Sequence, residues 1–264
     1  MNDDAGDATP GGPPRLERGA DGVATITLDR PRHLNRLHGE DLDALQRHFE
    51  TLRADPTLRV LVLTGRGRVF CAGFHLGELG AADGAAAGPQ DFERTVDALE
   101  ALALPTVARL NGSVYGGATD LALACDFRIG VQGMELRMPA ARLGLHYYPS
   151  GLRRFVDRLG VAAAKRIFLR GEALDDAALQ AVGYLDECVP AAALDAAIAR
   201  LLAALAAGAP LALRGMKASL DDLAAGRADT TVLRAREALC AASEDLREGL
   251  AAAAARRAPG FVGR

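Results

Sequence analysis

Several features that would assign this chain of 264 residues to a function class are scarce or missing. Its four cysteines are Cys71, Cys125, Cys188 and Cys240. None belongs to a C-x-x-C pair, so we expect neither a zinc site nor a disulfide framework. Lysine occurs only twice, and the formal net charge of −3 gives no general attraction to nucleic acid or to an anionic membrane. We therefore expect no bound metal and no nucleic-acid partner.

Long uncharged apolar stretches are missing as well. No segment is long enough and free enough of charge to span a bilayer, and the polar, acidic N-terminus lacks the apolar part of a signal peptide. No G-x-G-x-x-G sequence follows a first strand, which argues against an oxidoreductase with a dinucleotide cofactor. We expect a soluble cytoplasmic protein with no membrane partner.

What the chain does contain is enough apolar sequence for a sizeable core, since 50% of its residues are hydrophobic. Residues 1–14 are rich in Asp, Gly and Pro and predict a disordered tail. Residues 15–205 alternate between β-rich and helical patterns, which predicts an α/β core with parallel crossovers. Residues 206–264 are rich in alanine at helical spacing and predict a helical C-terminal module.

Hydrophobic periodicity predicts the individual elements. Expected strands cover residues 22–28, 59–64, 106–110, 126–131 and 185–189. Expected helices cover residues 41–54, 92–103, 153–159, 162–169, 177–182, 191–207, 210–225 and 233–257. A glycine and alanine linker at residues 80–89 predicts a mobile surface loop, and residues 135–150 are expected to be irregular.

The most informative stretch is residues 111–126, a glycine turn that leads straight into an apolar helix. Gly116 and Gly117 let the backbone approach a ligand closely because they have no Cβ. The helix start leaves N–H groups without partners and favours negative charge, so the turn can hold an anion or a developing oxyanion. Asp120 falls in the first helical turn, where the dipole lowers the pKa of a carboxylate. It either caps the helix or acts as a base.

Two ordered motifs resemble the signatures of the enoyl-CoA hydratase/isomerase (crotonase) superfamily. The first is VLVLTGRGRVFCAGFHL at residues 60–76, and the second is the glycine turn at residues 111–126. Supporting similarity lies at residues 29–35, 210–217 and 256–261, and it extends from Leu16 to the C-terminus. The resemblance implies an α/β crotonase (ClpP-like) fold of stacked ββα-type units with a helical trimerisation module. It also implies a homotrimer or homohexamer.

The resemblance further implies an enzyme that acts on an acyl-CoA thioester. In the family, two backbone N–H groups hold the thioester oxygen as it becomes an enolate, and by position these donors are those of Phe74 and Gly117. Positions that contact CoA in the family correspond to Arg32, Leu34, Ala72 and Phe261, the last serving the same or a neighbouring subunit. Coenzyme A is then part of the substrate, and no separate cofactor is implied.

The chain departs from the family's hydratases in its expected acid–base residues. Those hydratases hold water between two glutamates; the first corresponds to Asp120, and the second corresponds to Ala140, which cannot donate, accept or titrate. Addition of water by two carboxylates is therefore not supported. His146 and Tyr148, in the loop that follows, can handle protons in its place, and Tyr147 is expected to line an acyl pocket.

Several functions stay open from the sequence. The motifs indicate an enoyl-CoA hydratase/isomerase family enzyme that works through a stabilised enolate. Its reaction could equally be isomerisation, hydrolysis or decarboxylation of an acyl-CoA. A non-catalytic acyl-CoA-binding protein that has lost its acid–base pair is the alternative from a different class.

Overall fold

The computed structural model describes residues 11–75, 77 and 88–264. Most of the predicted tail and of the predicted loop at residues 80–89 lies outside this part. The tail prediction is wrong for residues 12–14, because strand β1 (Gly12–Arg18) already begins there and pairs with β2 (Val23–Asp29). Pro13 and Pro14 lie on an edge strand, at a register shift between Gly12 and Arg15, where a missing N–H is tolerated.

The main sheet has six strands in the order β1-β2-β3-β4-β6-β9. Its remaining members are β3 (Val60–Gly65), β4 (Thr106–Leu110), β6 (Phe127–Val131) and β9 (Glu187–Val189). β1 pairs antiparallel with β2, and every other pairing is parallel, so the predicted parallel crossover from β2 to β3 is confirmed. β3 is buried along its whole length, as its continuous apolar run predicts.

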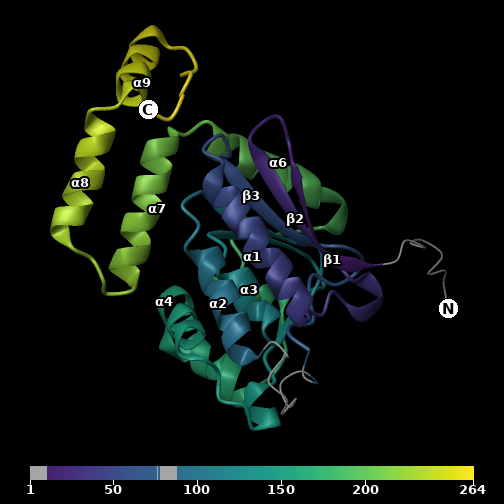
Figure 1. The fold of residues 1–264 in the computed structure, drawn as a ribbon. Helices are drawn as coiled ribbons and strands as arrows, with labels where there is room; N and C mark the ends of the chain where they lie inside the picture. Colours follow the sequence, from purple (N-terminus) through teal and green to yellow (C-terminus); the bar gives the residue numbers. More distant parts are fainter. Residues whose placement is uncertain (1–10, 76, 78–87) are drawn as a thin grey trace.

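Helices cover this sheet and carry a second, smaller one. The core helices are α1 (Gly39–Ala54), α2 (Pro89–Glu100), α3 (Ala118–Leu123), α4 (Pro149–Lys165), α5 (Asp176–Ala181) and α6 (Leu194–Ala206). Figure 1 shows α1 and α2 across one face of the sheet and α6 behind it, where α6 contacts β3 and β6. The second sheet has the order β5-β7-β8, formed by β5 (Val114–Tyr115), β7 (Glu135–Arg137) and β8 (Leu174–Asp175). The α/β class is confirmed.

The two helices expected at residues 153–159 and 162–169 are confirmed, because α4 is interrupted at Gly160, whose φ of +78° is not helical. The second of them continues into a π-helical turn at Arg166–Arg170. Two other predictions of secondary structure need correction. The single helix expected at residues 233–257 is two helices, α8 (Thr230–Ala241) and α9 (Glu244–Ala255), because the Ser243 hydroxyl accepts from Leu246 N–H and caps a new start. The segment expected to be irregular, residues 135–150, contains β7 and a 3₁₀ turn at Ala140–Leu143.

The C-terminal helices stand apart from the sheet. α7 (Pro210–Ala224) and α8 lie side by side at one end of the molecule, with α9 beyond them (Figure 1). The predicted boundary at residues 205 and 206 falls in the last turn of α6, which ends at Ala206. Lys217 on α7 ties this module to the core, since its Nζ donates to Asp126 at 2.7 Å and to Leu104 O at 3.1 Å.

Within the described ranges, no single helix is long and apolar enough to cross a membrane. The segments Ala191–Ala206 and Pro210–Ala224 are long and apolar enough for a membrane span only when they are counted as one. The chain bends by 103° between them.

Candidate active site

Five of the predicted site residues line one pocket of about 170 Å³. They are Ala72, Phe74, Gly117, His146 and Tyr148. The pocket lies where three segments meet: the loop after β3, the start of α3, and the stretch from β7 to α4. Tyr147 also lines it, as predicted. Among the residues that the structure describes, no carboxylate lines this pocket, so its walls are apolar apart from the tyrosines, the histidine and the backbone.

The backbone N–H groups of Phe74 and Gly117, the two predicted donors, have no hydrogen-bond partner within the described chain, and both residues line the pocket. Gly73, between the two segments, has φ +84°, and a Cβ there would lie 2.7 Å from Tyr115 O and 2.8 Å from Gly117 N. Only glycine permits this approach of the two backbones. The predicted donors are thus brought to the same pocket with both N–H groups available for a ligand oxygen.

Asn35 holds the loop that presents Phe74. This residue is buried, and its side-chain Nδ2 donates to Arg66 O at 2.8 Å and to Val69 O at 2.9 Å. Its Oδ1 accepts from Arg30 N–H at 2.9 Å. Nδ2 also donates to Phe70 O at 3.1 Å. A single buried amide therefore bonds to four backbone groups and fixes in place the loop that carries one donor of the pocket.

Asp120 does not line the pocket. It is fully buried behind Tyr148, and its Oδ2 accepts from the Tyr148 hydroxyl at 2.5 Å and from Arg154 Nη1 at 2.6 Å. The helix α3 has no side-chain cap, so the capping role expected as one alternative is absent. The carboxylate meets the pocket only through the tyrosine hydroxyl.

The expectation that the helix dipole lowers the pKa of Asp120 is wrong. Burial raises the pKa of Asp120 above its ordinary value, and the guanidinium of Arg154 and the hydroxyl of Tyr148 only partly oppose this effect. Full removal from water penalises the charged form more than the dipole of a six-residue helix favours it. Asp120 is therefore a stronger proton acceptor than an exposed aspartate.

Tyr147 and Tyr148 form a hydroxyl chain that leads to this carboxylate. The Tyr147 hydroxyl donates to that of Tyr148 at 3.1 Å, and the two rings stack with centroids 4.2 Å apart. Burial raises the pKa of each tyrosine well above its ordinary value, with smaller effects from the neighbouring hydroxyl and from Asp120. Both phenols are consequently neutral at physiological pH.

His146 lies at the exposed rim of the pocket, and its Nδ1 is 2.8 Å from Tyr147 O. It is not hydrogen-bonded to Asp120 or to Tyr148 within the described structure. Of the two residues predicted to handle protons, Tyr148 is the one that the fold connects to a carboxylate.

Of the four residues predicted to contact CoA, three lie near one another and the fourth, Phe261, lies elsewhere. Leu34 O accepts from Ala72 N–H at 2.9 Å, so these two residues are adjacent at one side of the pocket. Arg32 is exposed in the 3₁₀ turn Pro31–His33, just before Leu34. Phe261 does not line the pocket; its carbonyl accepts from Arg59 at 2.8 Å, and its ring lies close to Gly249 on α9.

Ala140 lines the pocket and is 4% exposed, so the position that resembles the second glutamate presents only a methyl group. No group of three or more His, Cys, Asp or Glu side chains within the described residues could hold a metal ion. The polar chemistry of the pocket therefore comes from its backbone donors, the tyrosines and His146.

Three residues of this region were missed by reasoning from sequence. Arg154 is fully buried, although its position in an Arg-Arg pair on an amphipathic helix predicts an exposed charge. Phe92 on α2 lies against Gly117, where an added Cβ would be 2.7 Å from the ring. A Cβ at Gly151 would lie 2.7 Å from Tyr148 Cε2 and 2.8 Å from Asp120 Oδ2. Glycine at position 151 is the only signal of this close packing that the sequence contains.

Comparison with known proteins identifies the family and agrees with the fold. The family model described as "Enoyl-CoA hydratase/isomerase" matches residues 18–264. A 2,3-dehydroadipyl-CoA hydratase of Escherichia coli is 30% identical over 247 residues, covering 92% of this chain and 96% of its own length. The mitochondrial enoyl-CoA hydratase domain-containing protein 2 of Bos taurus is 32% identical over 254 residues, with 92% and 85% covered.

Solved structures show the same fold. An enoyl-CoA hydratase from Bacillus anthracis superimposes with a TM-score of 0.85 at 26% identity, covering 95% of this chain and 99% of that one. DspI of Pseudomonas aeruginosa superimposes with a TM-score of 0.87 at 29% identity, with 98% and 100% covered. The fold is therefore the crotonase fold, and the chain belongs to the enoyl-CoA hydratase/isomerase family.

Proposed function

We propose that the protein acts on an acyl-CoA thioester and stabilises its enolate with the backbone N–H groups of Phe74 and Gly117. The observation that supports this most is that both N–H groups are without partners within the described chain at one apolar pocket, which Tyr148 also lines. Relatives named as enoyl-CoA and dehydroadipyl-CoA hydratases support the same substrate class. Each such donor contributes about 2.7–4 kcal/mol to lowering a barrier of this type.

Double-bond isomerisation fits the side chains better than hydration. Isomerisation needs one group that removes a proton from the α carbon and returns it to the γ carbon, while the electron pair passes through the thioester enolate. Tyr148 can take that proton as it passes its own to Asp120, whose raised pKa suits it as acceptor. Hydration needs a second group to activate water, and Ala140 cannot provide one.

Decarboxylation of an acyl-CoA carrying a β-carboxylate is the second candidate. Loss of CO₂ leaves its electron pair as the enolate, so the enzyme need supply only a proton to the α carbon. Burial raises the pKa of Tyr148, so its phenol is protonated at physiological pH and has a proton to give to the α carbon. The same two backbone donors would hold the oxyanion.

A turnover panel separates these reactions. The purified protein would be given 3-enoyl-CoA, crotonyl-CoA and a β-carboxyacyl-CoA, with products resolved by chromatography. We expect isomerisation of the 3-enoyl thioester to be the fastest reaction. Binding of all the thioesters without turnover would contradict the enzyme and leave an acyl-CoA-binding protein. An Asp120→Asn variant that kept the full rate would remove Asp120 from the mechanism.

We propose further that the protein is a homotrimer, or a hexamer of two trimers, assembled through its C-terminal helices. α7 exposes Met216, Leu220 and Leu223 with relative exposures of 56%, 65% and 55%, which is unusual for a helix that faces water. In such an assembly Phe261 of one subunit would reach the CoA site of another. Light scattering of the purified protein tests this, and a monomer at micromolar concentration would contradict it.

We also propose a cytoplasmic location, with coenzyme A entering only as part of the substrate. All four cysteines are free, which is typical of proteins kept in a reducing compartment. Fractionation of cells that express a tagged chain tests the location.

A further inference from the structure

Arg154 on α4 is a fully buried guanidinium shared by three carboxylates. Its Nη1 donates to Asp120 Oδ2 at 2.6 Å, its Nη2 to Asp97 Oδ1 at 2.7 Å, and its Nε to Glu100 Oε1 at 2.9 Å. The planar guanidinium fixes the directions of these bonds relative to one another. Asp120 on α3 is therefore held in a fixed position relative to two carboxylates of α2.

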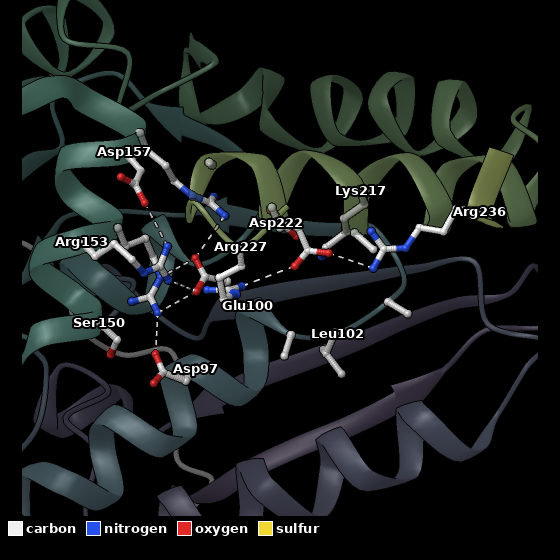
Figure 2. A pocket seen from close by; sticks show the side chains of 17 residues that line it. Asp97, Glu100, Leu102, Ser150, Arg153, Asp157, Lys217, Asp222, Arg227 and Arg236 are labelled. Atoms are coloured by element: carbon white, nitrogen blue, oxygen red, sulfur yellow. Dashed lines mark hydrogen bonds and ion pairs between the residues drawn. The ribbon is translucent and has the colours of Figure 1, made fainter. Parts of the chain in front are cut away.

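The Arg154 side chain lies between a charged cleft and the apolar pocket. On one side is a cleft of about 460 Å³ lined by residues of α2, α4 and α7, including Arg154 itself. Figure 2 shows Asp97 and Glu100 at this cleft, where Glu100 also accepts from Arg153 at 2.7 Å. On the other side, Asp120 accepts from Tyr148 at the apolar pocket.

The ionised form of Asp120 depends on pairing with Arg154, because Asp120 is buried and a surface carboxylate would instead be stabilised by water. Both of its described hydrogen bonds go to Oδ2, and its buried Oδ1 has no partner within the described structure. A carboxylate removed from water is costly unless it is paired, and Arg154 is the cation that pairs with it. Without that cation, the ionised Asp120 would keep only the bond from Tyr148.

We propose that Arg154 is the positioning residue of the Tyr148–Asp120 pair. It holds the Asp120 carboxylate, in its ionised form, at the place where the Tyr148 hydroxyl donates to it. α2 supplies the counter-charges that keep the guanidinium there, and the same helix carries Phe92 to the pocket. This inference rests on the proposed role of Tyr148 in proton transfer, and it adds a residue that does not touch the acyl pocket.

The charged and titratable groups around Asp120 come from several elements. Tyr147, Tyr148 and Arg154 face it from the start of α4 and the preceding loop, Glu100 from α2, and Tyr184 from the loop after α5. Burial alone would lower the pKa of Arg154, but the charges of Asp120 and Glu100 outweigh it and raise the net pKa. Arg154 is therefore the fixed positive charge of this group.

The first test replaces Arg154 with lysine, which keeps the charge and removes the fork of N–H donors. We expect kcat to fall by about 10–100-fold, within the range of general acid–base catalysis, with KM unchanged within about threefold. Arg154 lowers the pKa of Asp120 by its charge and by its hydrogen bond. Lysine keeps the charge, so the variant loses the part due to the guanidinium hydrogen bond, and that loss raises the pKa of Asp120. The acid limb of the kcat profile should therefore move to higher pH.

Arg153→Lys is the matched control. Arg153 lies on the same helix and also pairs with Glu100, but it does not contact Asp120 within the described structure. We expect this variant to keep kcat, KM and the acid limb of the wild type. If Arg154→Lys does not fold, Asp97→Asn removes one anchor of the guanidinium at a partly exposed position, and we expect a drop in kcat of about threefold in the same direction.

A second readout needs no turnover. Carboxyl ¹³C NMR of protein labelled at aspartate, with Asp120→Asn for assignment, follows the titration of Asp120 directly. A higher pKa of Asp120 in Arg154→Lys supports the positioning role even if the wild type turns over no acyl-CoA, in which case only the proposed function fails. An unchanged Asp120 titration, or wild-type kcat with an unmoved acid limb, would overturn the proposal.

Discussion

The apolar pocket and the charged cleft differ in how their polar groups are partnered. The cleft is the larger space, about 460 Å³ against about 170 Å³, and it has many more charged residues. Its charges pair with each other, as Asp222 does with Arg227 and Arg236 (Figure 2). The pocket has few polar groups, but the N–H groups of Phe74 and Gly117 are left without partners. Unpaired donors in an apolar wall indicate chemistry better than volume or charge does.

The largest loss of activity is expected when the phenol hydroxyl of Tyr148 is removed from the pocket. In Tyr148→Phe the hydroxyl that connects the pocket to Asp120 is lost while the ring remains. We expect kcat on 3-enoyl-CoA to fall by about 10²–10⁴-fold, the usual contribution of a positioned acid–base group. Tyr147→Phe is the control, because its hydroxyl only donates to Tyr148; we expect a loss of less than about tenfold. Equal losses in both variants would contradict the assignment.

The backbone donor of Gly117 can be removed by proline, and the steric effect of the added ring can be measured separately. Gly117 has φ −57°, close to the angle that proline imposes, so Gly117→Pro removes its N–H. We expect kcat to fall by about 10²–10³-fold. Gly117→Ala places a similar Cβ against Phe92 but keeps the N–H, so it measures the steric part alone. If alanine cost as much as proline, the N–H would not be the group that matters.

The pH dependence of kcat follows from the Asp120 carboxylate. Burial raises its pKa above the ordinary 3.8, and the relay needs the ionised form as proton acceptor. The rate should therefore fall as the pH drops through this raised pKa, at a higher pH than an exposed aspartate would give. Tyr148 should add no basic limb below pH 10, because burial raises its pKa well above the ordinary value of 10.0. An acid limb that persisted in Asp120→Asn would point to another group.

The smallest effect is expected in the cleft. Asp222→Asn removes a carboxylate that pairs with Arg236 at 2.9 Å and with Arg227 at 3.7 Å, and that has no described contact with Arg154 or Asp120. We expect kcat to stay within about twofold and the free energy of unfolding to fall by less than about 1 kcal/mol, since exposed ion pairs contribute little. Urea unfolding and steady-state kinetics measure both. A loss of activity like that of Tyr148→Phe would make the cleft a functional site.

The two walls of the pocket also differ in how well the sequence predicts them. The backbone wall follows from glycine turns after apolar strands, and Phe74 and Gly117 can be named because local sequence determines where such turns lie. The side-chain wall depends on which helices pack together. Nothing local shows that Arg154 is buried while its neighbour Arg153 is partly exposed, or that Asp120 is covered by Tyr148.

In the fold, too, features set by local sequence are predicted well, and features set by contacts between distant segments are missed. Long apolar runs such as β3 and β4 are predicted within a residue or two. β1 is missed because its prolines argue against a strand, and only pairing with β2 at the edge of the sheet permits them. The break between α8 and α9 depends on one capping serine, Ser243, within an otherwise continuous helical pattern.

A crystal structure with a bound, unreactive acyl-CoA amide analogue tests the central claim most directly. An amide analogue keeps a carbonyl oxygen in place of the thioester oxygen. We expect this oxygen at about 2.7–3.1 Å from both Phe74 N and Gly117 N, with the Tyr148 hydroxyl facing the α carbon. An oxygen out of reach of either N–H group, or an acyl chain bound in the charged cleft instead, would contradict it.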